Sequence, residues 1–157
     1  MQKPQIKSFS LRDNVGFFVE GIPQVMARKD SVPGTGRVRR RDPSGRKAGW
    51  SSNVHTAGWI ARSGNVGRYI GNKLDPRQTV YVSVTLYFPP PKGKDSRKDW
   101  GDNPMGDGDR YVVLILDALA GVWFANDRQV WHAVTKHYHA PGECPGAYIE
   151  IGEVEYL

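Results

Sequence analysis

The most regular pattern of apolar and polar positions lies in residues 79–88, TVYVSVTLYF, where every second residue is Val, Leu or Phe. Since successive side chains of a strand point to opposite faces, this alternation predicts a strand with one buried face. Shorter β-favouring runs predict a first strand over 15–20 and later strands over 129–138 and 147–156. The three prolines at 89–91 would end the first-mentioned strand, because proline cannot donate to a sheet ladder.

Two further segments are predicted to be helical. Residues 110–119 are apolar all round except for Asp117, a pattern typical of a buried helix, and Gly121 would end it. Asp117 would then be a buried carboxylate that needs a partner. A second helix is expected over 51–62, where apolar residues are scattered among polar ones. The order of strands and helices predicts an α/β or α+β fold.

The length of 157 residues suits one domain with its own core, and we take residues 1–157 as that domain. Two stretches poor in apolar residues are expected to be loops: a flexible basic loop at about 28–49 and a polar loop at about 92–105. Trp50 and Trp100 fall in or beside these stretches, where either core packing or stacking on bases would suit them. Neither a signal peptide nor a membrane-spanning run is predicted, so the expected setting is the cytoplasm.

Charge is distributed unevenly along the chain. The net charge is +6, from 22 Lys and Arg against 16 Asp and Glu. Between Arg28 and Lys47, eight basic residues stand against two acidic ones, so this block holds the whole excess. Such a block favours phosphate binding with a strong salt dependence, although a solvated loop is the alternative. The residues expected to bind DNA are Arg28, Lys29, Arg37, Arg39, Arg40 and Arg41.

Acidic residues are concentrated in one segment of this basic chain. Asp107 and Asp109 stand one residue apart, and Asp127 follows in a polar turn after the apolar run. Two carboxylates held close together repel unless they share a cation, and Mg²⁺ prefers carboxylate and water oxygens. Gly106 and Gly108 leave this backbone open to close approach. Taken singly, Asp109 would also suit a helix N-cap and Asp127 a turn, so a structural explanation stays open.

Other kinds of site have less support. The single cysteine, Cys144, cannot form an intramolecular disulfide, and no specific base is paired with it. No phosphate-cradling glycine motif is present, so an enzyme acting on small molecules is least expected. The spacing of the histidines near the C-terminal end fits no zinc motif: His132, His137 and His139. The last strand carries glutamates expected to face solvent: Glu150, Glu153 and Glu155.

Three short motifs carry the acidic residues. They are D-x-D at 107–109, an apolar helix that ends D-A-L-x-G at 117–121, and the turn D-x-Q-V at 127–130. In this pattern and its spacing the chain resembles the RusA family of Holliday junction resolvases. The wider layout is also similar: a first strand that ends near Pro23, a basic loop and helix, a strand, the acidic segment, and a strand with a late lysine.

The resemblance implies a RusA-like fold, one compact domain with a mixed sheet and two main helices. It implies a homodimeric endonuclease of phage or prophage type that acts in recombination and repair. Such an enzyme would require Mg²⁺, with Mn²⁺ as an alternative, and would cut two strands of a four-way or otherwise branched DNA symmetrically, with no membrane and no small-molecule cofactor. Asp107, Asp109 and Asp127 would be its catalytic, metal-binding residues. The turn at 24–28 and the segment that leads into Asp107 would contact the DNA.

The chain also departs from the family pattern. The family commonly has Asn after the second aspartate and Lys four residues after it, where this chain has Arg110 and Val113. Arg110 or Lys136 is therefore expected to supply the missing positive charge, and Asp117 to support the site. Two other functions stay open: a branched-DNA-binding protein without catalysis, and a metal nuclease that prefers other branched DNA. A nuclease of the D…(D/E)xK kind is less favoured, because no such lysine follows a second acid.

Overall fold

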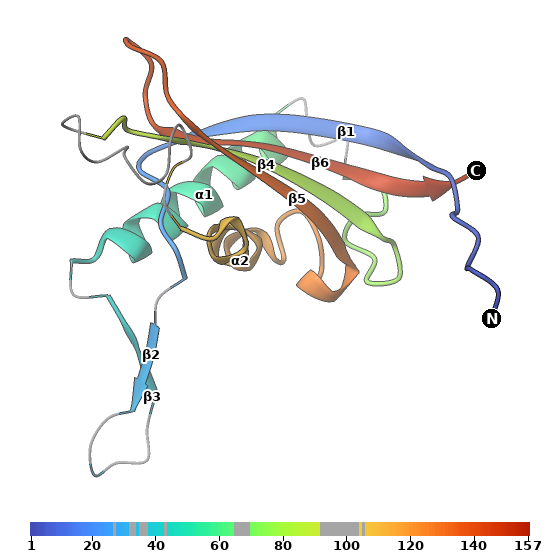
Figure 1. Cartoon of the computed structure of the whole chain (residues 1–157), viewed down its shortest axis with the longest axis horizontal. Coiled ribbons are helices and arrows are strands. Elements are labelled where there is room, and N and C mark those ends of the chain that lie inside the picture. Colours follow the sequence, from blue (N-terminus) through green and yellow to red (C-terminus); the bar gives the residue numbers. More distant parts are fainter. Residues whose placement is uncertain are drawn as a thin grey trace.

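The computed structural model describes residues 1–26, 28–31, 34, 38–42, 44–64, 70–91, 104 and 106–157. Four strands form a mixed sheet in the order β1-β6-β4-β5, and two helices cover one of its faces (Figure 1). The strands are β1 (Phe9–Glu20), β4 (Val80–Phe88), β5 (Val130–Tyr138) and β6 (Gly146–Tyr156). The helices are α1 (Arg46–Ser63) and α2 (Gly108–Leu119). The predicted α+β fold with a mixed sheet and two main helices is confirmed.

The hydrophobic core lies between this sheet and the two helices. As the alternation predicts, β4 turns five apolar side chains into the core and leaves the residues between them partly exposed: Val80, Val82, Val84, Leu86 and Phe88. One side of α2 meets them, with Val112, Ile115 and Leu119 fully buried. In the turn after α2, the Trp123 indole N–H donates to the Gly58 carbonyl of α1 at 2.9 Å. This bond joins the C-terminal end of α2 to α1.

The direction of the strands decides how the chain crosses the sheet. β1 pairs antiparallel with β6, and β6 pairs antiparallel with β4. β4 and β5 are parallel, in a register that runs from Val80 opposite Val130 to Phe88 opposite Tyr138. Because parallel strands cannot be joined by a tight turn, residues 89–129 form a crossover, and α2 lies within it.

The basic segment holds more regular structure than the sequence predicts. β2 (Arg28–Ser31) and β3 (Val38–Arg41) pair antiparallel and extend away from the sheet and helices (Figure 1). The prediction of a loop over the whole of 28–49 is therefore wrong. It failed because the sequences RKDS and VRRR lack the alternation that marks a half-buried strand, and this hairpin is held by backbone pairing.

The start of α1 was also missed. The helix begins at Arg46 instead of at residue 51, because the Asp42 carboxylate accepts hydrogen bonds from the backbone N–H groups of Lys47 (3.3 Å) and Ala48 (3.0 Å). Trp50 lies in the added turns and is 3% exposed, so it belongs to the core and is not available to stack on bases. The sequence does not predict this start, because Gly45 before the helix and Gly49 in its first turns are poor helix formers.

β1 begins at Phe9, earlier than predicted. A register shift between Arg12 and Val15 interrupts its alternation, and Asp13 there has a φ of 51°. An irregularity of this kind re-aims the side chains of the bulged strand, so the polar residues before Val15 do not resemble a strand in sequence.

A buried polar cluster lies against this irregularity. Glu153 is fully buried, which contradicts its predicted exposure on a solvated strand face. Its carboxylate accepts from Arg12 Nε at 2.8 Å and from the backbone N–H of Asn72. The Lys73 side chain is also fully buried and donates to the Asp13 carbonyl at 2.7 Å. Burial lowers the pKa of Lys73, while the Glu153 hydrogen bond raises that of Arg12.

Parts of the predicted loops lie outside the described residues. These are residues 92–103 and 105 of the polar loop, with Trp100 among them, and residues 32–33, 35–37 and 43 of the basic loop, with Arg37 among them. The predictions made for them stay predictions. Among the helices of the described residues, none has the length and apolar character needed to cross a bilayer.

Candidate active site

The segment that leads into α2 lies directly against β5. A Cβ atom on Gly108 would come within 2.7 Å of Val134 Cγ1, so only glycine allows this approach. Gly106 has a φ of 97°, and a Cβ there would stand 3.0 Å from the Tyr111 ring. The expectation that these two glycines permit close approach is confirmed. The Tyr111 ring in turn packs against Phe88, and its burial raises the pKa of its hydroxyl group.

The first two aspartates stand at the N-terminus of α2. Asp107 is the N-cap residue and Asp109 lies in the first turn. The N-cap role suggested for Asp109 is wrong, since Asp107 holds that position, and the Asp107 side chain itself makes no capping hydrogen bond. Both residues are exposed, and the Asp109 side chain is 85% exposed. The positive end of the helix dipole favours negative charge here, and both carboxylates remain open to a ligand.

Two side chains of β5 flank these aspartates. His132, Val134 and Lys136 share one face of the strand, because they are two residues apart. His132 Nε2 stands 3.6 Å from Asp109 Oδ1, an ion-pair contact when the imidazole is protonated. The Lys136 amine donates to the carbonyl oxygens of Pro104 (3.1 Å) and Gly106 (2.5 Å). Lys136 therefore holds the chain just before Asp107.

The third aspartate lies at the other end of the crossover. Asp127 begins the short 3-10 helix η3 (Asp127–Gln129), directly before β5. Asn126 performs the capping of this turn, because its side chain accepts from the Arg128 N–H at 3.0 Å. The Asp127 side chain is exposed, and among the described residues it has no hydrogen-bond or ion-pair partner. A turn-forming role does not account for its carboxylate.

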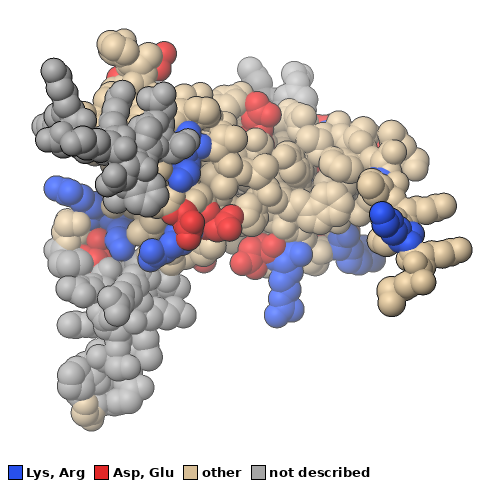
Figure 2. All heavy atoms as spheres, in the orientation of Figure 1, with Lys and Arg blue, Asp and Glu red and all other residues tan. Residues whose placement is uncertain are grey.

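Both acidic segments of the crossover, the start of α2 and η3, thus lie next to β5. Asp109 reaches β5 at His132, and Asp127 precedes the first residue of β5 by three positions. In the part of the chain that the structure describes, no three Asp, Glu, His or Cys side chains are grouped to bind one ion. In the view of Figure 2, acidic side chains gather below the sheet with lysine and arginine side chains on either side.

Asp117 and Val113 occupy the exposed side of α2. Asp117 is exposed, so its predicted burial is wrong; α2 buries one side and is not apolar all round. Asp117 lines a hollow of about 310 Å³ together with Asp42 and Lys47. Val113, where the family lysine would stand, is 47% exposed and lies one turn after Asp109. A lysine would fit there sterically.

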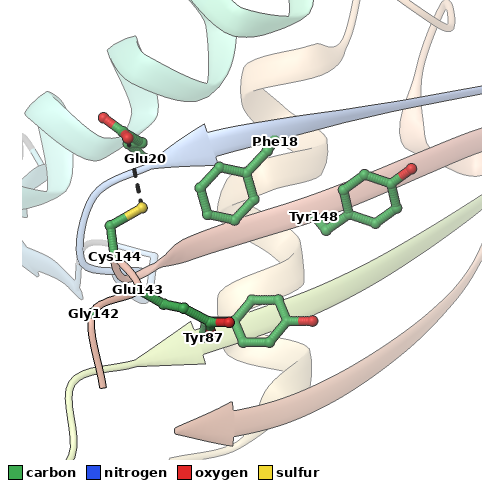
Figure 3. A pocket seen from close by; sticks show the side chains of 7 residues that line it. All are labelled: Phe18, Glu20, Tyr87, Gly142, Glu143, Cys144 and Tyr148. Carbon is green, nitrogen blue, oxygen red and sulfur yellow. Dashed lines mark hydrogen bonds between the residues drawn. The ribbon is translucent and has the colours of Figure 1, made fainter. Parts of the chain in front are cut away.

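A second hollow lies on the uncovered face of the sheet (Figure 3). It measures about 720 Å³ and is lined by Phe18, Tyr87 and Tyr148 from three strands. Cys144 stands at its edge, with Sγ 3.5 Å from Glu20 Oε1. Desolvation by the surrounding atoms, followed by the nearby Glu20 carboxylate, raises the pKa of the exposed Cys144, which disfavours the reactive thiolate.

Sequence reasoning missed two residues near the acidic elements. His132 fitted no zinc motif and was expected at the surface or against phosphate, but its even spacing from Lys136, which places both side chains on one strand face, was not used. Gln129 is 6% exposed, and its amide bonds both to the turn that carries Asp127 and to the loop before β4. Its position in D-x-Q-V was the available signal. Of the residues expected to bind DNA, Arg28, Lys29, Arg39, Arg40 and Arg41 lie on the β2–β3 hairpin.

Comparison with known families gives a match to endodeoxyribonuclease RusA over residues 64–152, more than half of the chain. The chain belongs to the RusA family. It is therefore an endonuclease, a hydrolase of the kind that resolves Holliday junctions in recombination, and branched DNA is its substrate. The family resemblance inferred from the three acidic motifs is confirmed. The matched region contains β4, α2, η3 and β5, with all three aspartates. No match to the chain was found among curated proteins.

The two hydrogen bonds of the Lys136 amine generate a first prediction. Lys136→Met should lower the rate of junction cutting by about ten- to a hundredfold, because small displacements of a catalytic group are costly. Its effect on the free energy of unfolding should be modest, about 1 kcal/mol. Single-turnover cutting and urea denaturation measure the two effects. Lys7→Met removes an equal charge next to Tyr156 and should leave the rate unchanged. Equal rates for both variants would contradict the positioning role of Lys136.

Proposed function

We propose that this RusA-family endonuclease requires Mg²⁺ and cuts a Holliday junction by paired, symmetric hydrolysis of phosphodiester bonds, with Asp107, Asp109 and Asp127 as its catalytic, metal-binding residues. The observation that supports this most is the pair of exposed carboxylates at the N-terminus of α2: the Asp107 side chain makes no capping hydrogen bond, and Asp109 has only the contact with His132. Exposed carboxylates in a basic chain that are not used to cap a helix are candidates for cation binding.

The donor set fits a magnesium ion. Mg²⁺ is commonly bound through one or two carboxylates and keeps water or substrate phosphate as its other ligands. Asp107 and Asp109 supply such a pair, and Asp127 comes from the turn at the start of the same strand. When bound, the ion would polarise the scissile phosphate and generate a hydroxide-like water at neutral pH. Mn²⁺ accepts the same oxygen ligands.

The surrounding residues fix these carboxylates and add positive charge. Lys136 holds the backbone before Asp107, and His132 stands beside Asp109. The Arg110 N–H donates to the Asp107 carbonyl (3.1 Å), and its carbonyl accepts from Met26 N–H (3.3 Å). Its backbone is thus fixed at the first turn while its side chain is exposed. Because the Lys136 amine is already bonded to two carbonyls, Arg110 is the better candidate to stabilise charge on the phosphate in the transition state.

DNA binding is assigned to the basic hairpin and to the turn that leads into it. β2 and β3 extend beyond the sheet and helices (Figure 1), and their sequences contain five of the expected DNA-binding residues. Contacts of this kind hold phosphates and do not read bases. We call Asp107, Asp109 and Asp127 together the acid site. A homodimer would present two such hairpins and two acid sites with twofold symmetry, which suits paired cuts in a symmetric junction.

The catalytic assignment is tested by replacing each aspartate with asparagine. Asp107→Asn, Asp109→Asn and Asp127→Asn should each slow junction cutting by at least about a hundredfold. Junction binding in EDTA should be equal or tighter, since each variant removes a negative charge that repels phosphate. Gel-shift titration and single-turnover cutting separate the two effects.

Glu143→Gln is the matched control for these variants. Glu143 is an exposed acid at the hollow on the opposite face of the sheet, and its replacement should leave cutting and binding unchanged. Full cutting by any of the three aspartate variants would remove that residue from the catalytic set. Tight junction binding by the wild-type chain without cutting, in Mg²⁺ or Mn²⁺, would favour a protein that binds branched DNA without catalysis.

The role of Arg110 leads to a separate prediction. Arg110→Ala should lower the single-turnover rate by about a hundredfold with a smaller loss of junction affinity. Adding Val113→Lys to this variant should restore part of the rate, because residue 113 is exposed one turn after Asp109. An Arg110→Ala enzyme that cuts at the full wild-type rate would exclude this role.

A further inference from the structure

We propose that Gln129 is the positioning residue for Asp127: its buried amide locks the turn that carries this carboxylate to the loop before β4. The inference rests on the proposed catalytic role of Asp127 and adds a residue to that site. Gln129 is 6% exposed, whereas Asp127, two residues earlier, is exposed. Gln129 therefore holds the turn from inside the molecule, while Asp127 presents its carboxylate at the surface.

The oxygen of the amide holds the turn itself. Gln129 Oε1 accepts from the backbone N–H of Ala125 at 2.8 Å and from that of Asn126 at 3.2 Å. The second bond completes a capping box with the bond from Arg128 N–H to the Asn126 side chain. The backbone on both sides of Asp127 is thereby fixed, although its carboxylate makes no hydrogen bond or ion pair with another described residue.

The nitrogen of the amide holds a different part of the chain. Gln129 Nε2 stands within hydrogen-bond distance of three carbonyl oxygens in the loop before β4, those of Lys73 (2.9 Å), Asp75 (3.0 Å) and Gln78 (2.8 Å). An amide offers two N–H groups and two main acceptor directions, so two of these carbonyls share one N–H group and no donor is left unused. Glutamate would lack the donors, and methionine would lack both donor and acceptor. Asparagine has the same groups but is one methylene shorter.

The loop that receives these bonds is itself fixed to the sheet. The Gln78 side chain donates to the carbonyls of Thr79 and Val154, both at 3.0 Å. The Lys73 amine donates to the Asp13 carbonyl in β1. Through this loop, Gln129 therefore connects the Asp127 turn to β1 and β6. Without this bond set, the hydrogen bonds that remain to the turn among the described residues are local ones, such as those from Val130 N–H to the Asp127 carbonyl and from Arg128 N–H to the Asn126 side chain.

The test compares Gln129→Met with Asn53→Leu. Both replace an amide by an apolar side chain of similar length, but the Asn53 amide donates to the Glu20 carbonyl, a bond that involves neither the Asp127 turn nor the loop before β4. Hydrogen exchange at the amides of Ala125 and Asn126 reports directly on the turn. Junction cutting titrated with Mg²⁺ reports on Asp127. Gln129→Asn is the gentler variant if the methionine variant does not fold, since it keeps an amide that cannot span both segments.

For Gln129→Met or Gln129→Asn we expect exchange at both amides to be at least about tenfold faster, because each loses its acceptor. The Mg²⁺ concentration for half-maximal cutting should rise about tenfold or more, with junction binding in EDTA unchanged. Asn53→Leu should show neither effect. Wild-type exchange and wild-type Mg²⁺ dependence in a folded Gln129 variant would overturn the proposal, as would the same changes in Asn53→Leu. If the wild-type chain cuts nothing, the proposed function fails, while the exchange measurement still decides whether Gln129 holds the turn.

Discussion

The parallel pairing of β4 with β5 obliges the chain to cross the sheet between residues 89 and 129, because two parallel strands cannot share a tight turn. Every element of the acid site belongs to this crossover. Its helix, α2, begins with Asp107 and Asp109, and its last turn carries Asp127. Both ends of that path meet β5: the helix start packs on Val134, and the last turn continues into the strand.

Charged residues in this molecule fall into two groups with different physical roles. Lys73 and Glu153 are fully buried, and each is bonded to a neighbouring group; they support the irregular part of β1. The acid-site aspartates are exposed and contribute little to such contacts, so they cost little desolvation energy. Hydrogen bonds to the neighbouring backbone hold the segments that carry them: those of Lys136 before Asp107, and those of Gln129 before Asp127. Rigid backbone and free carboxylates suit a site that takes its cation together with substrate phosphate.

The sequence predicted the elements that are held by burial against the core and missed those that are held by other interactions. The alternation in β4 and the apolar run of α2 predicted both elements, because burial against one core leaves a periodic pattern. The β2–β3 hairpin and the first turns of α1 were not predicted. Backbone pairing and the Asp42 contact hold them, and these interactions leave no periodic pattern of apolar residues in the sequence. The aspartates were identified through motif spacing. The buried Glu153 and the bonds of Gln129 depend on partners far away in the chain, which a single sequence does not reveal.

The central claim is that the acid site at β5 makes this chain a metal-dependent resolvase. The most direct measurement is incubation of the purified protein with a labelled four-way junction and a matched linear duplex, in Mg²⁺ and in EDTA. The account predicts paired, symmetric nicks in the junction alone, and no nicks in EDTA. Equal cutting of the linear duplex, or cutting of the junction that persists in EDTA, would contradict it.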